Sequence, residues 1–223
     1  MIHDLVNLII KALIQFACRV EADELRKVPH SGPLILATNH INFLEVPLVY
    51  IWLQPRPVEA LIKIETMKNP FFGLLMKLWG GIPVKRGQYD RTALIQTIDS
   101  LKRGNILAIA PEGTRSKSGT LLQGQPGIIP VAQKSGAPIL PLVFYGHEDF
   151  WENLKKFRKT DFKIVVGEPF QIKDPGSTFS REMRKEIADQ IMFQLAVLLP
   201  EKYRGVYSDL DRVNTEYFTF KES

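Results

Sequence analysis

The sequence contains little cysteine and no long uninterrupted hydrophobic run. Its single cysteine, Cys18, cannot form a disulfide within the chain, which favours a reducing compartment. Cys18 stands in an apolar segment, so we expect a small buried residue rather than a reactive thiol. No apolar stretch approaches the roughly 20 residues that a membrane-spanning helix needs. Solenoid repeats, zinc-ligand spacings and RNA-binding motifs are also missing, so nucleic acid is not an expected partner.

The first 22 residues differ in character from the rest of the chain. Asp4, Lys11 and Arg19 interrupt an otherwise apolar segment that lacks the features of a signal peptide. Its apolar residues recur at helical spacing and are Leu5, Leu8, Ile9, Ala12, Leu13 and Phe16. Such a helix could pack on the domain or lie in the headgroup layer of a membrane, and the rest of the sequence favours the second. The net charge of +5 suits an anionic membrane surface or a phosphorylated substrate.

The remaining length suits one domain. We divide the chain into an amphipathic N-terminal helical segment (1–22), a main domain (23–200) and a tail (201–223) packed on or trailing that domain. Periodicity predicts strands at 34–38, 58–64, 82–85, 106–110, 138–145 and 162–166. It predicts helices at 43–52, 66–79, 91–103 and 181–199. This alternation predicts an α/β fold with a mixed, largely parallel sheet flanked by helices.

A polar cluster follows the first predicted strand of the main domain. Open α/β sheets bind ligands at the carboxyl ends of their strands. His40 could act there as a base, oriented by the carboxylate of Glu45. Asn42 and Glu45 also have the spacing of a helix capping box. On the residues alone, capping and catalysis are equally good interpretations.

Two further clusters follow later strands. Lys85 and Arg86 come after a glycine turn, and two adjacent cations can hold a phosphate, although such pairs usually lie on a solvated surface. The third cluster is Pro111-Glu112-Gly113-Thr114-Arg115-Ser116. Its glycine permits a close backbone approach beside a hydroxyl and a guanidinium, as in anion sites.

Four blocks in order carry a family resemblance: NHINFLE, GGIPVKRG, PEGTRS and GAPILPLVFYG. Between about Gly32 and Tyr145 the chain resembles the glycerolipid acyltransferase family, and within it the bacterial 1-acylglycerol-3-phosphate acyltransferases. The resemblance implies that His40 is the catalytic base and Glu45 its acidic partner. It implies an acceptor-phosphate site at Lys85, Arg86, Glu112, Gly113, Thr114 and Arg115. Pro141 falls in the block linked to the acyl donor, with a structural role.

One position departs from the family pattern. The family usually has aspartate where this chain has Glu45, and the added methylene moves the carboxylate by roughly 1.5 Å, one carbon–carbon bond. Active sites tolerate about 0.5 Å of misplacement. Catalytic competence therefore depends on whether the backbone compensates.

The resemblance also implies a reaction and its setting. An acyl chain passes from acyl-CoA or acyl-carrier protein to the free hydroxyl of 1-acylglycerol 3-phosphate, giving phosphatidic acid, without a metal or bound cofactor. We expect a peripheral or monotopic protein on the cytoplasmic face of a membrane. The sequence contains no G-x-S-x-G elbow, so we expect no acyl-enzyme intermediate. The apolar helix at 66–79 could be core or could wall an acyl channel. A non-catalytic lipid-phosphate binder and a hydrolase that uses His40 to activate water are the alternatives.

Overall fold

A single twisted sheet organises the chain. The computed structural model describes residues 2–85, 87, 90–174, 176 and 178–220. The strands within these residues are β1 (Cys18–Glu21), β2 (Leu34–Thr38), β3 (Val58–Lys63), β4 (Ile82–Val84), β5 (Ile106–Ile109), β6 (Ile139–Tyr145), β7 (Thr160–Val166), β8 (Phe170–Ile172) and β9 (Phe218–Phe220). The helices there are α1 (Ile2–Ala17), α2 (Glu45–Trp52), α3 (Pro70–Leu78), α4 (Arg91–Lys102), α5 (Ile128–Ser135), α6 (Phe150–Lys155) and α7 (Arg181–Ala196), with short 3₁₀ helices between them.

The sheet is mixed and largely parallel, which confirms the predicted fold class. Its strand order is β1-β7-β6-β2-β5-β3-β4, with β8 and β9 attached beside β6. Strands β6, β2, β5, β3 and β4 run parallel to one another, and β7 is antiparallel to β6. The carboxyl ends of five neighbouring strands therefore meet at one edge.

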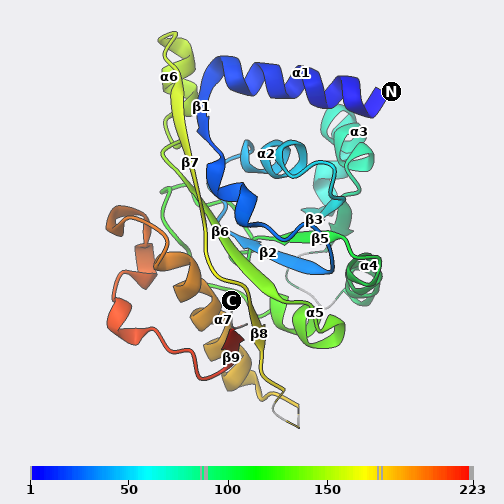
Figure 1. Cartoon of the computed structure of the whole chain (residues 1–223), viewed down its shortest axis with the longest axis vertical. Helices are drawn as coiled ribbons and strands as arrows, with labels where there is room; N and C mark the ends of the chain where they lie inside the picture. Colours follow the sequence, from blue (N-terminus) through cyan, green and yellow to red (C-terminus); the bar gives the residue numbers. More distant parts are fainter. Residues whose placement is uncertain (1, 86, 88–89, 175, 177, 221–223) are drawn as a thin grey trace.

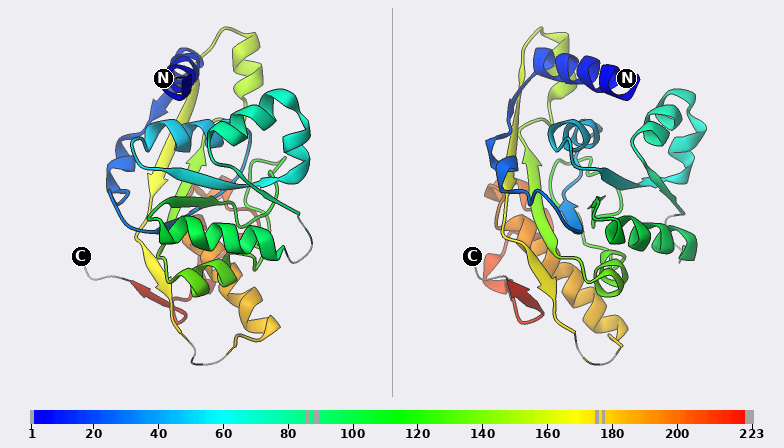
Figure 2. Two further views of the ribbon diagram at one scale, coloured as in Figure 1. Left: turned by 90° about the vertical axis from the view of Figure 1, so that its right-hand side faces the viewer. Right: turned by 45° about the vertical axis from the view of Figure 1, so that its right-hand side comes forward.

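Helices cover both faces of this sheet, as the alternation predicted (Figure 1, Figure 2). Successive side chains of a strand point to opposite faces. In β2, Ile35 and Ala37 join a core built with α4, α5 and α7. Leu34 and Leu36 join the other core, built with α1, α2 and α3. Burial of β2 on both faces explains its unbroken apolar sequence.

The helix predicted at 66–79 is divided in two. A 3₁₀ helix covers Ile64–Lys68, and α3 begins at Pro70. Asn69 between them has extended backbone angles, because the ring of a proline disfavours the helical conformation of the preceding residue. Helices α5 and α6 and strand β8 were not predicted.

The N-terminal segment is helical only to Ala17. Its last residues form β1, which pairs in parallel with β7, so part of the segment 1–22 belongs to the sheet. Cys18 is buried there as predicted, and burial raises the pKa of its thiol to about 11.

Helix α1 contacts the domain through a face of mixed polarity, in which Ile14 is buried in the core and Ile10 and Ala17 pack against it. Asn7 is buried and its side-chain oxygen accepts a hydrogen bond of 2.9 Å from the indole of Trp79. The Lys11 ammonium lies 5.2 Å from the ring centre of Trp52. The apolar stripe predicted from periodicity faces outward instead: its members Leu5, Leu8, Ile9, Ala12, Leu13 and Phe16 are all exposed. Within the described residues, no helix is long and apolar enough to cross a bilayer.

The tail packs on the domain. Residues 201–212 form three short 3₁₀ helices, and β9 adds to the sheet beside β8. Tyr203, Tyr207 and Phe218 are buried in the core that includes α7. Of the two expectations for the tail, packing is therefore the one observed.

Candidate active site

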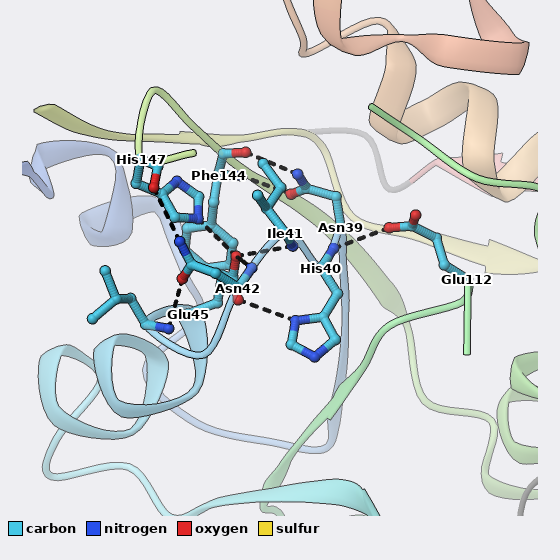
Figure 3. Close-up of polar contacts among 9 residues, drawn as sticks. Asn39, His40, Ile41, Asn42, Glu45, Glu112, Phe144 and His147 are labelled. Carbon is cyan, nitrogen blue, oxygen red and sulfur yellow. Dashed lines mark hydrogen bonds and ion pairs between the residues drawn. The ribbon is translucent and has the colours of Figure 1, made fainter. Parts of the chain in front are cut away.

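Four loops at one edge of the sheet bring the candidate residues together. His40 follows β2, Lys85 follows β4, Glu112 follows β5, and a second histidine, His147, follows β6. Because β2, β4, β5 and β6 run in the same direction, these loops lie at the same edge of the sheet. Figure 3 shows His40, Glu112 and His147 there, and Lys85 lines the same cavity as His40.

Asn39 fixes the end of β2. Its side-chain amide donates to the carbonyl of Phe144 and its oxygen accepts from the amide of Phe144, both at 2.8 Å. Since Asn39 is buried, this reciprocal pair ties the loop that carries His40 to the end of β6.

The predicted base and acid are in contact. Nδ1 of His40 lies 3.0 Å from Oε2 of Glu45. A carboxylate only accepts hydrogen bonds, so Nδ1 carries the proton and Nε2 presents its lone pair. Nε2 makes no hydrogen bond with any described residue, and the ring is partly exposed. This is the arrangement a general base requires.

The predicted capping box is only partly formed, because α2 begins at Glu45 itself and Asn42 is therefore not its N-cap. Oε1 of Glu45 accepts from the amides of Ile41 and Asn42 at 3.0 and 2.8 Å. The side chain of Asn42 accepts from the amide of Leu44, which is the residue just before α2. Glu45 therefore binds the amides of the loop before α2 with one oxygen and orients His40 with the other.

His147 is the residue that sequence reasoning missed. Its Nε2 donates to Oε1 of Glu45 over 2.7 Å, and its ring is fully buried and stacked on Phe162, 4.0 Å between centres. Its carbonyl accepts from the side chain of Asn42. The available signal was its place just after a strand, which is the rule that singled out His40.

Glu45 is a buried acceptor held by several donors. It is 3% exposed. Burial alone would raise its pKa, but the hydrogen bonds and charges of His147 and His40 outweigh burial and lower the pKa to about 2. The acid is therefore ionised throughout the physiological range and orients His40 as a carboxylate.

Glu112 connects two loops through backbone amides that bind both oxygens of its carboxylate. Its two oxygens accept from the amides of His40 and Leu122 at 3.0 and 2.9 Å. Burial raises its pKa to about 7, against the effect of these two amides. The amide of Ser116 donates to the carbonyl of His40 at 2.8 Å, so this loop holds the base from two sides. Glu112 is thus a positioning residue.

A cavity of about 600 Å³ opens beside His40. Lys85, Gly113 and Thr114 line it together with His40 and Glu45. Apolar side chains from α2, β3, α4, β5 and α5 form much of the remaining wall, among them Val46, Val49, Leu61, Leu94, Ile109 and Ile128. Such a cavity has a polar end and an apolar wall, which suits an amphiphile.

Two predicted residues lie away from the cavity, and a third is outside the described residues. Arg115 is exposed and is not among the residues lining the cavity. Pro141 is buried inside β6, paired with Ala37 of β2, in keeping with a structural role. Arg86 lies outside the described residues. None of the described side chains of 66–79 lines the cavity, and Met76 and Trp79 pack in the core, which favours the core interpretation of this helix over the channel wall.

The fold and the site place this chain in a known class. The family model described as Acyltransferase matches residues 19–145, more than half of the chain, and the chain belongs to that family. The match covers β1 to β6 and includes His40, Glu45, Lys85 and the Glu112 loop.

Several similar proteins are named 1-acyl-sn-glycerol-3-phosphate acyltransferase. The chain is 25% identical over 173 residues to the 1-acyl-sn-glycerol-3-phosphate acyltransferase of Bacillus subtilis, covering 78% of this chain and 84% of that protein. It is 30% identical over 146 residues to the protein of that name from Cocos nucifera, covering 63% of this chain but only 46% of that one. The crystal structure of the 1-acyl-sn-glycerophosphate acyltransferase PlsC from Thermotoga maritima has the same fold, with a TM-score of 0.61 and 22% identity, over 85% of this chain and 76% of that one.

Proposed function

We propose that this chain transfers an acyl group from a thioester to the free hydroxyl of 1-acylglycerol 3-phosphate, giving phosphatidic acid. The observation that carries the proposal is the His40–Glu45 pair, 3.0 Å apart at the mouth of an amphiphilic cavity that also contains Lys85. The names of the relatives support this acceptor.

The reaction needs one base and no covalent enzyme intermediate. Nε2 of His40 takes the proton from the acceptor hydroxyl as its oxygen forms a bond to the thioester carbonyl carbon. Glu45 stabilises the resulting imidazolium. When the tetrahedral intermediate collapses, the carbon–sulfur bond breaks and the imidazolium returns the proton to the leaving thiolate. Acyl-CoA and acyl-carrier protein are both suitable donors for this step.

The acceptor phosphate has a cationic partner in the cavity. Lys85 is a point charge that can hold a phosphate oxygen, and Gly113 and Thr114 add backbone and hydroxyl groups to the lining of the same cavity. Arg86 and Arg115 remain proposed phosphate ligands from the motif alone. Fixing the phosphate places the neighbouring hydroxyl near the thioester, which lowers the barrier through proximity.

The decisive assay measures thiol release from acyl-CoA with and without lysophosphatidate. We expect acceptor-dependent release that falls by about 10²- to 10⁴-fold in His40→Ala, the contribution of a positioned base. His30→Ala is the matched control, because His30 is an exposed histidine outside the site. Release without acceptor would indicate a hydrolase, and binding without turnover would indicate a lipid binder. Full activity in His40→Ala would contradict the proposal.

We further propose that α1 lies in the headgroup layer on the cytoplasmic face of a membrane, where acceptor and product reside. The support is its outward apolar stripe, in which Leu8 and Phe16 are 65% and 77% exposed. The variant Leu8→Ser/Leu13→Ser/Phe16→Ser should sediment less with liposomes while leaving β1 intact. Val206→Ser removes an equally exposed apolar side chain from the tail and serves as the control. Unchanged sedimentation of the triple variant would remove the hypothesis.

A further inference from the structure

The turn between α6 and β7 presents an apolar side chain among cations. Its sequence is Lys155-Lys156-Phe157-Arg158-Lys159, and all five residues are exposed. Phe157 is 98% exposed, the highest value among the exposed large hydrophobic residues of the described chain. Its φ of 52° is a left-handed conformation that strains any residue except glycine. The chain thus keeps a strained phenylalanine at a tip where folding gains nothing from its ring.

Helix α6 is fixed below this tip by aromatic contacts. Phe150 is buried and lies edge-on to Phe43, 6.0 Å between ring centres. Trp151 stacks on the same ring at 5.5 Å yet stays more than half exposed, and Leu154 is exposed one turn later. The helix is therefore held on one side and presents Trp151, Leu154 and the tip outward.

The tip lies beside the end of α1. The Lys159 ammonium donates to the carbonyl of Gln15 at 2.9 Å, and Arg19 pairs with Asp161 at 2.6 Å. Figures 1 and 2 show α6 next to the point where α1 runs into β1. The exposed Phe16 at the end of α1 and the exposed residues of α6 thus belong to one end of the molecule.

The positive charge of this end comes from the turn and not from α1. Within α1 the charges of Asp4 and Lys11 cancel, and the Lys11 ammonium lies over the ring of Trp52. Arg19, which follows the helix in β1, is paired with Asp161. In the turn, Lys156 has Glu152 at 3.7 Å, whereas the side chains of Lys155 and Arg158 make no ion pair with a described residue.

We propose that the turn 155–159 is a second membrane anchor, selective for anionic lipid. Phe157 inserts below the headgroups, and Lys155 and Arg158 contact lipid phosphates, while α1 contributes apolar contact without net charge. The inference rests on the membrane docking of α1 proposed above. An acidic protein surface would satisfy the cations. It would not account for a fully exposed phenylalanine at the same end of the molecule as the outward stripe of α1.

The test compares sedimentation with vesicles of phosphatidylcholine alone and of phosphatidylcholine mixed with phosphatidylglycerol. Wild type binds the anionic vesicles more tightly. Lys155→Gln/Arg158→Gln should lower that binding by about fivefold for each cation removed and leave binding to neutral vesicles unchanged. Phe157→Ser should lower binding to both kinds by about tenfold. Arg181→Gln/Lys185→Gln removes the same charge from exposed positions of α7, away from α1 and α6 in Figure 1, and should change neither.

A second measurement separates this anchor from the proposed activity. Acyl transfer to lysophosphatidate in detergent micelles should be unchanged in the turn variants, because no residue of the turn lines the cavity. Absence of transfer by wild type would overturn the enzymatic proposal and leave the binding results standing. Wild-type vesicle binding by both turn variants would overturn the anchor and leave α1. If the turn variants bind vesicles like wild type but lose transfer only from acyl-carrier protein, the anchor proposal is also overturned. The turn would then be a binding site for that acidic protein.

Discussion

At the scale of single residues, the chain accommodates a glutamate where its family usually has aspartate. The α2 helix begins at Glu45 itself, two residues later than expected. The longer side chain reaches back over the loop, so that one oxygen meets His40 and the other meets two amides and His147. The backbone and a second histidine thus compensate for the added methylene.

Shortening this side chain should therefore reduce activity, although it restores the usual family residue. In Glu45→Asp the carboxylate withdraws by roughly 1.5 Å and cannot keep all its donors. We expect kcat to fall by about 100-fold, the usual cost of an ångström of misplacement, with little change in KM. Glu59→Asp, at a carboxylate that contacts Arg103 away from His40, is the control. Equal or higher kcat in Glu45→Asp would show that the contacts of Oε1 are dispensable.

The donors around Glu45 also predict a pH dependence of stability. Its pKa is about 2 in the folded protein and 4.5 when unperturbed, so its contribution is present above pH 4.5 and lost as pH falls towards 2. The full contribution is of the order of 3 kcal/mol. Denaturant unfolding of wild type and Glu45→Gln should show a gap at pH 7 that narrows below pH 4.5 and closes only as the pH approaches 2. A gap independent of pH would mean that the pKa is not lowered.

His147 should act on catalysis through Glu45. His147→Phe keeps an aromatic ring against Phe162 but removes the donor, whereas His147→Gln keeps a donor near the position of Nε2. Residues that orient a functional histidine typically contribute 10- to 100-fold in metal sites, and we expect kcat of His147→Phe to fall by about tenfold. The glutamine variant should recover most of it, and the pH profile of kcat should shift only in His147→Phe. Equal activities of the two variants would reduce His147 to a packing role.

The sequence made His40 and Glu45 readable because both lie in one short loop after a strand. His147 was not readable, since its link to Glu45 joins positions 102 residues apart. Glu112 was assigned to substrate from its motif. Its contacts with the amides of His40 and Leu122 become visible only when the loops after β2 and β5 are in place.

At the scale of elements, periodicity predicted the position of α1 but not which of its faces packs on the domain. Six apolar residues at helical spacing suit a helix buried on that side or exposed on it, and the contacts of the opposite face, made by Asn7, Lys11 and Ile14, show which. The short helices α5 and α6 have eight and six residues, too few for a clear period.

The start of helix α4 should influence acceptor binding. Asp90 precedes α4, and its two oxygens accept from the amides of Ala93 and Lys85 at 3.0 and 3.1 Å. It therefore fixes the start of α4 and the position of Lys85 together. Asp90→Ala should raise the KM for lysophosphatidate several-fold with kcat nearly unchanged. Asp99→Ala, an exposed residue of the same helix, should leave both constants alone.

At the scale of the whole molecule, the tail supports the site from behind. The carbonyl of Tyr203 accepts from the amide of Leu121, and the Tyr207 hydroxyl accepts from the amide of Gly124, both at 2.9 Å. Between them, the amide of Leu122 donates to Glu112. The tail thus orders the segment that positions Glu112 and, through it, His40.

Removing one hydroxyl should test this support. Tyr207→Phe leaves the Gly124 amide and the Asp189 carboxylate without their shared partner. We expect a loss of about 1–3 kcal/mol in the free energy of unfolding, the cost of a buried unsatisfied group. Acyl transfer below the unfolding transition should fall modestly. Tyr217→Phe, at a more exposed tyrosine of the tail, should stay near wild-type stability. An equal loss of stability in Tyr217→Phe would mean that the hydrogen bonds of Tyr207 have no special role in supporting the site.

The lone cysteine at the end of α1 gives the chain a native reporter. Cys18 is 2% exposed between α1 and β7, and its raised pKa keeps the sulfur protonated at neutral pH. A thiol reagent can label it only when the start of β1 detaches from β7, so the labelling rate measures how often that junction opens. Lipid that holds α1 in place should slow the labelling, which allows membrane docking to be followed without attaching a probe.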